Sequence, residues 1–190
     1  EIREGFSMNV TPSFKKITEK KSSFDALALR EVYGIIYSAP EQELALADFF
    51  QTNQLTITRL SSSETFLPYL PLEENLFIAS TIKERDRKVV LAEAFQVFQL
   101  EPALLGRSFT SFTTFEKIKM RIIQLLLSKT STLVIDDIFS SLTIGQRQEI
   151  LPQLKIAVQK RNKRLLFLTK DPQIIDSPYV HPLSLHALLN

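Results

Sequence analysis

The stretch Leu133-Val134-Ile135-Asp136-Asp137 is a short apolar run that stops at two carboxylates. A continuous apolar run of this length is typical of a strand that is buried on both faces of a parallel sheet. Two similar runs end at Tyr37-Ser38 and at Thr169-Lys170-Asp171. Ligands in open parallel sheets bind beyond the carboxyl ends of the strands. These three ends are therefore candidates for one functional site.

Helices are predicted between the strands from apolar periodicity and from capping boxes. Thr113-x-x-Glu116 and Thr143-x-x-Gln146 open two helices, and Ser38-x-x-Glu41 opens a third. Pro152 is expected to kink or split the helix that follows Thr143. Strands that alternate with helices predict an α/β fold with a largely parallel core sheet. The predicted strands are 24–28, 32–37, 55–60, 132–135 and 164–168, and the predicted helices are 40–51, 73–79 (its start), 85–100, 113–127 and 143–160.

The composition argues against several classes of site. Only four of the 190 residues are glycine, whereas an average usage of about 7% would give roughly 13, so a glycine-rich phosphate loop is ruled out. The absence of cysteine and the presence of only two histidines argue against thiolate chemistry and a histidine-rich metal site. A net charge of +2 is too small to indicate nucleic acid. The basic cluster Lys160-Arg161-Lys163-Arg164 is expected to be a solvated helix end.

The length and patterning predict a single domain over residues 1–190. A chain of this length can bury a sizeable core, and no internal repeat or linker is evident. No stretch of about 18 apolar residues is present, and the beginning shows no secretory pattern. We therefore expect a cytoplasmic protein.

The order of the predicted elements resembles the nucleotide-binding domain of ABC transporters, in the P-loop NTPase superfamily, over roughly residues 24–180. Asp136 matches the magnesium-linked aspartate at the end of the family's Walker B strand, and Asp137 stands at the catalytic glutamate. The stretch after them, 138–143, is similar to the family's "PTSALD". Leu168-Thr169-Lys170-Asp171 looks like its switch motif "xTHD", with Lys170 in place of histidine. Glu74-Asn75-Leu76 matches a helix start that follows the family's glutamine loop.

The glycine-dependent motifs of that family are altered. Residues 37–44 have the length of the phosphate loop without its glycines, and this alignment makes Ser38, Glu43 and Leu44 nucleotide-binding positions. Glu43 replaces the family's lysine. Counting back from Glu74 puts Ser62 at the glutamine of the glutamine loop, and counting back from Asp136 puts Thr113-Thr114 in the signature peptide. These nucleotide-binding positions are therefore degenerate.

The resemblance implies a three-layer sandwich with a small N-terminal antiparallel β part and a helical subdomain at roughly 68–128. It also implies a homo- or heterodimer with another nucleotide-binding domain, a membrane transport subunit as a further partner, and no nucleic acid. The implied location is cytoplasmic, extending to a peripheral position at the inner face of the membrane. Phe14 is the nearest candidate for the aromatic residue that stacks on adenine. The apolar residues Phe109, Phe112 and Phe115 are expected to form an exposed protein-contact surface.

We expect a degenerate ATP-binding subunit, a pseudo-ATPase without a working phosphate loop or signature motif, with a structural or regulatory role in a transport complex. A triphosphate would meet the like charge of Glu43, and Asp137 and Lys170 occupy the catalytic positions in forms expected to be inactive. No cofactor is expected, or Mg-ATP if the site retains function, with Asp136 as the magnesium ligand. Two alternatives remain: an atypical but active ATPase that uses Asp136 and Asp137, and a cytosolic scaffold or regulator unrelated to transport. Asp136 could also be only a cap, and Lys170-Asp171 a solvated turn.

Overall fold

The computed structural model describes residues 24, 27–53, 55–62 and 66–189. Five strands in this part of the chain form one sheet in the order β2-β3-β4-β1-β5, and every neighbouring pair is parallel. The predicted α/β fold with a parallel core sheet is therefore confirmed. The strands are β1 (Val32–Ile36), β2 (Ile57–Leu60), β3 (Thr132–Asp136), β4 (Arg164–Thr169) and β5 (His181–Pro182).

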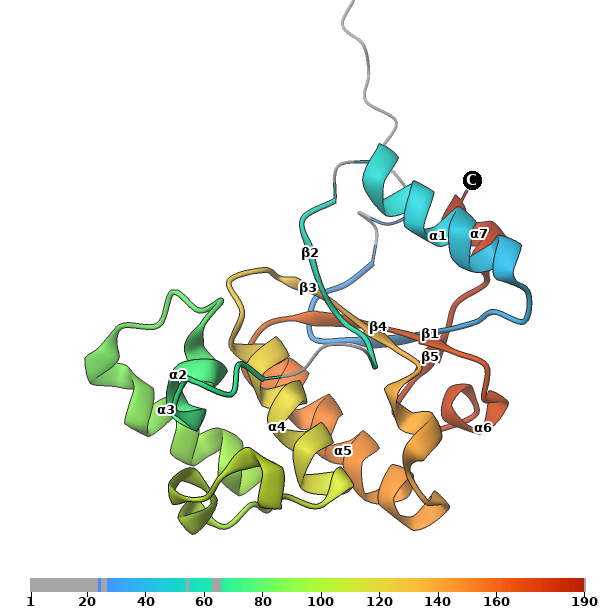
Figure 1. Ribbon diagram of the computed structural model, residues 1–190. Coiled ribbons are helices and arrows are strands. Elements are labelled where there is room, and N and C mark those ends of the chain that lie inside the picture. The colour runs from blue at the N-terminus through green and yellow to red at the C-terminus, as the bar shows by residue number, and fades with distance from the viewer. Residues whose placement is uncertain (1–23, 25–26, 54, 63–65, 190) are drawn as a thin grey trace, which may run out of the picture.

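Helices cover both faces of this sheet (Figure 1). Helices α1 and α7 lie on one face, and α4 and α5 lie on the other, with α2 and α3 packed outside them. Among the described residues, no helix is both long enough and apolar enough to span a membrane. The helices are α1 (Pro40–Thr52), α2 (Leu72–Phe77), α3 (Glu84–Val97), α4 (Thr114–Leu127), α5 (Ile144–Lys160), α6 (Pro172–Ile175) and α7 (Leu185–Leu189), with the 3-10 turns Pro102–Gly106, Phe109–Ser111 and Ile138–Ser141.

The side chains of β3 and β4 belong to two separate cores, because successive residues of a strand point to opposite faces of the sheet. Val134 and Leu166 pack with Leu46 of α1 on one side. Leu133 and Phe167 belong to the larger core on the side of α4 and α5. Both strands are thus buried on both faces, as their apolar runs predict, and the three-layer sandwich is confirmed.

Strand β1 approaches α6 so closely that only glycine fits at Gly34. A Cβ atom there would lie 2.2 Å from Ile175 Cδ1 and 2.7 Å from Val180 Cγ1. The two neighbours are themselves buried, so they have little room to move away. One of the few glycines in the chain therefore serves helix–sheet packing.

The segment predicted as a strand at 24–28 contains no strand among its described residues. Phe24 lies in a turn closed by a hydrogen bond from Leu27 N to Phe24 O (3.1 Å). The Phe24 ring packs against the rings of Phe49 and Phe50 on α1, so its apolar character serves helix packing rather than strand pairing. The predicted N-terminal antiparallel β part and Phe14 lie outside the described residues.

Two of the three predicted capping boxes are confirmed. Thr113 Oγ1 accepts a hydrogen bond from Glu116 N (3.2 Å) at the start of α4. Thr143 Oγ1 accepts one from Gln146 N (3.3 Å) at the start of α5. The third box, at Ser38, is wrong, because α1 begins with a different cap.

Helix α5 runs unbroken across Pro152, so the predicted split of this helix is wrong. Proline removes one backbone donor from a helix. The flanking Leu151 and Leu154 are buried in the larger core. Their packing holds α5 together where that hydrogen bond is missing.

The basic cluster at the end of α5 is solvated only at Lys160, which is exposed; the sequence prediction is wrong for its three other members. Lys163 Nζ donates to Ser128 O (2.8 Å), and desolvation lowers the pKa of this lysine. Arg161 Nη2 donates to a carbonyl of α3 (3.1 Å). Arg164 Nη1 donates to Phe24 O (3.1 Å). These cations therefore satisfy backbone carbonyls between elements instead of presenting a free charged surface.

The phenylalanines ahead of α4 do not form the exposed surface that was expected. Phe112 is buried, and the Phe109 ring lies between the rings of Phe66 (centroids 4.4 Å apart) and Phe112 (5.5 Å). Phe115 is partly buried against the core, with Lys119 Nζ 4.2 Å from its ring centroid. These aromatic residues pack the helical part internally.

Candidate functional site

The carboxyl ends of β1, β3 and β4 meet at one edge of the sheet. Tyr37 N donates to Thr169 O (3.1 Å), and Asp137 N donates to Leu168 O (2.9 Å). Asp136, the last residue of β3, pairs in register with Leu168. We call this region the carboxyl edge. It collects the acidic end of β3 and the polar residues that follow β1 and β4.

Two side chains enclose the carboxylate of Asp136, one from β2 and one from the residue that follows β1. The Tyr37 hydroxyl donates to Oδ1 (3.2 Å), and the Arg59 guanidinium forms a salt bridge with Oδ2. Asp136 is only 9% exposed, so both of its oxygens face protein groups. Arg59 Nη2 also lies 3.7 Å from Glu43 Oε1 on α1. The guanidinium therefore lies between two carboxylates that come from different layers.

Tyr37 is a hydrogen-bond donor in this cluster. Desolvation, with the charges of Asp136 and Asp137 adding to it, raises the pKa of the Tyr37 hydroxyl well above its ordinary value. The hydroxyl thus stays protonated across the physiological pH range. The exposed Lys170 places its Nζ 5.3 Å from the centroid of the same ring, where the ring quadrupole favours a cation.

Asp137 adopts a left-handed backbone conformation, with φ 44° and ψ 30°. Aspartate and asparagine tolerate this region better than other non-glycine residues. Desolvation raises the pKa of Asp137 despite the opposing effect of Lys170. Ser140 Oγ donates to Asp137 O (3.0 Å) and closes the turn that follows. The carboxyl group of Asp137 is thus partly buried and separated from the Arg59 cluster by its own backbone turn.

The start of α1 is capped by the side chain of Gln42. Its Oε1 accepts hydrogen bonds from Ser38 N (2.8 Å) and Ala39 N (3.3 Å), and the N-cap residue is Ala39. The predicted cap by Ser38 is wrong because the amide of Gln42 reaches back over the turn, and the Ser38 hydroxyl itself donates to it (3.4 Å). Two backbone donors just ahead of this helix, Ser38 N and Ala39 N, are therefore engaged and not free for an anion.

The remaining predicted positions on α1 point to solvent. Glu43 is exposed, and its Oε1 lies 3.7 Å from Arg59 Nη2. Leu44 is 70% exposed and has no hydroxyl to offer a metal. Neither residue supplies a group that binds phosphate.

A cleft of about 270 Å³ lies beside the carboxyl edge. It brings together Ser62, Thr114 and Asp137, and the cations Lys117 and Arg121 also line it. The structure thus places two of the predicted nucleotide-binding positions beside the predicted catalytic carboxylate. The adjacent Thr113 is exposed and engaged as the cap of α4.

The turn after β4 is held by Asp171. Its Oδ1 accepts from Gln173 N (2.9 Å) as the cap of α6, and its carboxylate forms a salt bridge with Arg147 of α5. The Asp171 backbone N–H donates to Thr169 Oγ1 (3.0 Å). Asp171 is therefore a structural residue, whereas Lys170 beside it is exposed.

Sequence reasoning missed the residues that complete this site. Arg59 is the key omission, and its signal is an arginine placed one residue before the end of a short strand. Gln42 was passed over because serine is the commoner cap. Arg147 carried no recognisable signal, because its partner Asp171 is 24 residues away in the sequence.

The residues at the carboxyl edge do not fit a magnesium–nucleotide. Magnesium needs free carboxylate oxygens and keeps several waters, whereas both oxygens of Asp136 already have partners. Glu43 would repel phosphate where a lysine would attract it. Among the described residues, no three His, Cys, Asp or Glu side chains are grouped so that they could hold a metal ion.

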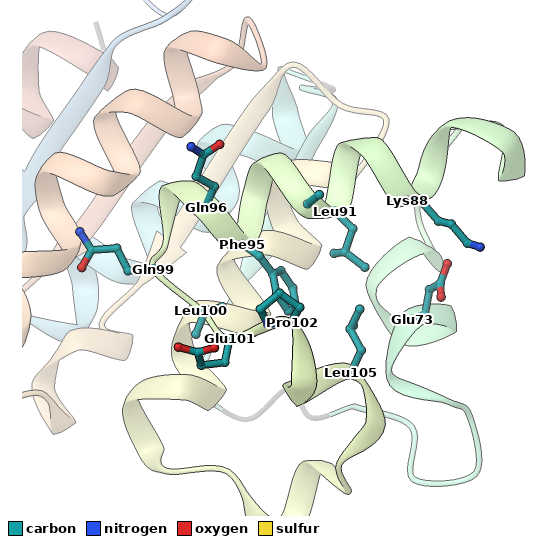
Figure 2. Close-up of a pocket in the computed structure, with 11 residues that line it drawn as sticks. Glu73, Lys88, Leu91, Phe95, Gln96, Gln99, Leu100, Glu101, Pro102 and Leu105 are labelled. Atoms are coloured by element: carbon teal, nitrogen blue, oxygen red, sulfur yellow. The ribbon is translucent and has the colours of Figure 1, made fainter.

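A larger apolar pocket lies in the helical part, away from the carboxyl edge (Figure 2). It has a volume of about 690 Å³ and lies between α2, α3 and the turn Pro102–Gly106. Leu91, Phe95 and Leu105 form its apolar wall, with Glu73 and Lys88 at one end. No predicted site residue lines it, so it is separate from the edge cluster.

Comparisons with known proteins place this fold. No protein-family model matches the chain, and no curated protein sequence matches it. Solved structures do match. The chain is similar to a metal-chelate type ABC transporter in an inward-facing conformation (16% identity, TM-score 0.66), covering 84% of this chain and 70% of that one.

The bacterial ABC transporter cassette MJ0796 in its dimeric structure is also similar, with 13% identity and a TM-score of 0.62 over 83% of this chain and 82% of that one. A post-hydrolysis dimer of the same cassette bound to ADP and phosphate gives 14% identity and a TM-score of 0.59, over 78% and 79%. Likeness at these identities shows the fold. The chain therefore has the P-loop NTPase-like fold of ABC transporter ATP-binding cassettes.

Proposed function

We propose that this protein is a cassette-type subunit of a transport complex that does not hydrolyse ATP and acts as a structural or regulatory module. The observation that carries the proposal is the salt bridge from Arg59 to Asp136, with Glu43 on its other side. An aspartate in this position can bind magnesium only when its oxygens are free. Here the protein supplies its own cation.

The start of α1 supports the same proposal. A helix N-terminus binds phosphate through backbone N–H groups that have no other partner. The side chain of Gln42 already accepts from two N–H groups in this turn. Glu43 then adds a negative charge where the incoming anion would lie. Mg-ATP would have to displace the cap and approach a carboxylate.

The proposed partner is a second ATP-binding cassette, identical or different, and the proposed location is the cytoplasmic face of a membrane. Structures of similar fold are dimeric cassettes, which supports pairing of this kind. A membrane transport subunit is the further partner. The apolar pocket between α2, α3 and Pro102–Gly106 offers such a protein a surface that lies away from the carboxyl edge.

Nucleotide binding by the purified chain tests the proposal. Titration with a fluorescent ATP analogue in the presence of magnesium is expected to show no saturable binding at micromolar concentrations, and the chain is expected to release no phosphate from ATP. Asp136→Ala and the matched control Asp176→Ala, at an exposed acid after α6, should behave like the wild type. Micromolar binding that only Asp136→Ala abolishes would overturn the proposal. ATP turnover that Asp137→Asn abolishes would favour the active ATPase instead.

A further inference from the structure

The carboxylate of Asp136 is paired with one cation, Arg59, and neither of its oxygens is free for a second. The Tyr37 hydroxyl and the Arg59 guanidinium take one carboxylate oxygen each. The side chain of Asp136 is 10% exposed, whereas that of Arg59 is 38% exposed. The carboxylate is therefore the buried member of the pair, and the arginine reaches it from the solvent side.

The position of Arg59 in the sheet explains this reach. In β2, Arg59 pairs in register with Val134 of β3, two residues before Asp136. A long side chain at this point can extend along the strand direction to the carboxyl edge. The guanidinium of an arginine carries a permanent charge in proteins. A divalent cation, by contrast, comes and goes with its concentration.

We propose that the guanidinium of Arg59 replaces a divalent cation at Asp136, so that the carboxyl edge is neutralised from within the chain. The inference rests on the proposed function only in that Asp136 matches a magnesium position. The need of the Asp136 carboxylate for a counter-charge does not depend on that match. An enclosed carboxylate needs a counter-charge, and here the counter-charge is a side chain of the adjacent strand.

The surrounding charges agree with this arrangement. Glu43 lies 3.7 Å from the same guanidinium and shares its charge. Lys170 stands over the Tyr37 ring and acts on Asp137, so it is not the counter-ion of Asp136. Removing Arg59 would leave Asp136 with a single neutral donor and a free oxygen, which is the condition under which a divalent cation can bind.

The test compares Arg59→Gln with the wild type in the full chain. Gln keeps a hydrogen-bonding side chain but removes the charge. The control is Arg85→Gln, at an arginine on α3 whose side chain is 77% exposed. Two quantities are measured: the Tm with and without about 10 mM Mg²⁺, and Mn²⁺ binding followed by its electron paramagnetic resonance signal.

Arg59→Gln is expected to lower the Tm by about 5 °C, because it strips a buried carboxylate of its partner. Magnesium is expected to restore about 3 °C of this loss, and Mn²⁺ should bind with a millimolar Kd. Both metal effects should vanish in Arg59→Gln/Asp136→Asn. The wild type and Arg85→Gln should show neither effect.

The inference is overturned if Arg59→Gln binds no more Mn²⁺ than the wild type, or if the wild type binds Mn²⁺ through Asp136. If Arg59→Gln fails to fold, two other variants test the inference. Arg59→Gln/Asp136→Asn must then recover folding, since it removes both charges, and Arg59→Lys must fold because it keeps the cation. Failure of either would also contradict the inference. Nucleotide binding by the wild type would instead contradict only the proposed function.

Discussion

The interior of the central strands and their carboxyl edge follow different rules. Inside the sheet, β3 and β4 carry only apolar residues between Leu133 and Ile135 and between Leu165 and Leu168, and each is buried. At the edge, a few residues further on, the chain carries Asp136, Asp137 and Lys170. The interior is fixed by packing, so any protein with this sheet needs it. The edge residues are charged or polar instead, and specific partners rather than close packing hold them.

In a protein with this sheet, a change of activity would alter the carboxyl edge and leave the interior unchanged. The edge of this molecule is internally paired: Arg59 with Asp136, Arg147 with Asp171, and Gln42 with the start of α1. Such pairing makes the edge resemble the interior in one respect, since most of these polar groups have partners within the protein; the buried Arg59 Nε is an exception. Five substitutions test how far that resemblance extends.

The largest effect is expected inside the sheet. Leu166→Ala removes a fully buried side chain of β4 that packs toward α1 and α7. The free energy of unfolding should fall by about 3 kcal/mol, from lost burial and the cavity left behind. Urea denaturation followed by circular dichroism measures it. A loss below about 1 kcal/mol would mean that the interior is far more tolerant than its burial indicates.

At the edge, Asp136→Ala should cost about 2 kcal/mol. It removes the partner of Arg59 and the acceptor of the Tyr37 hydroxyl, and the figure is below that of a fully buried pair because Arg59 is partly exposed. The same urea titration gives the value, with Asp176→Ala as the control. Stability equal to that of the control would show that the edge cluster contributes nothing to folding.

The helix starts give a third, smaller comparison. Thr143→Ala removes a side chain that caps α5, and the expected loss is about 1 kcal/mol. Ser38→Ala should cost a few tenths of a kcal/mol at most, because Gln42 supplies the acceptor at α1. Thermal melts of both variants, converted to free energies of unfolding, measure the two losses of stability. Equal losses would restore Ser38 as the cap.

The smallest effect is a dependence on pH. Desolvation raises the pKa of Asp137 above its ordinary value of 3.8. A carboxyl group whose pKa is higher in the folded state stabilises the protein below about pH 3.8, and this stability is lost as the pH rises through the folded-state pKa. Asn cannot ionise and tolerates the left-handed backbone. Asp137→Asn should therefore gain stability relative to the wild type as the pH rises from about 3.8 through the folded-state pKa of Asp137.

Urea titrations at several pH values measure this difference. Asp176→Asn is the control for removal of one negative charge. A relative stability of Asp137→Asn that falls with rising pH would contradict the sign of the shift.

Much of the fold could be predicted from local pattern. The apolar run ending at Asp136 and the capping boxes at Thr113 and Thr143 each depend on residues close in sequence, and each is found in the structure. The spacing of these elements was sufficient to indicate the cassette-type fold. The strand predicted at 24–28 is wrong because the apolar side chain of Phe24 packs against α1. Periodicity cannot distinguish such packing from a strand.

The candidate site was predictable in position but not in its pairing. The meeting of three strand ends follows from parallel topology, so the edge was located correctly. Arg59 and Asp136 are 77 residues apart, and the choice of partner depends on strand order, which local pattern does not contain. The same holds for Lys163 and Arg164, whose charges suggested solvent but whose partners are backbone carbonyls of distant segments.

The strand order also has a consequence for biosynthesis. Among the strands that the structure describes, β1 pairs with β4 and β5, which leave the ribosome last of the five, whereas β2 and β3 can pair earlier. At ordinary translation rates β1 waits on the order of ten seconds for a partner. During that time the apolar side chains of β1 lack the partner strand that covers them in the folded protein.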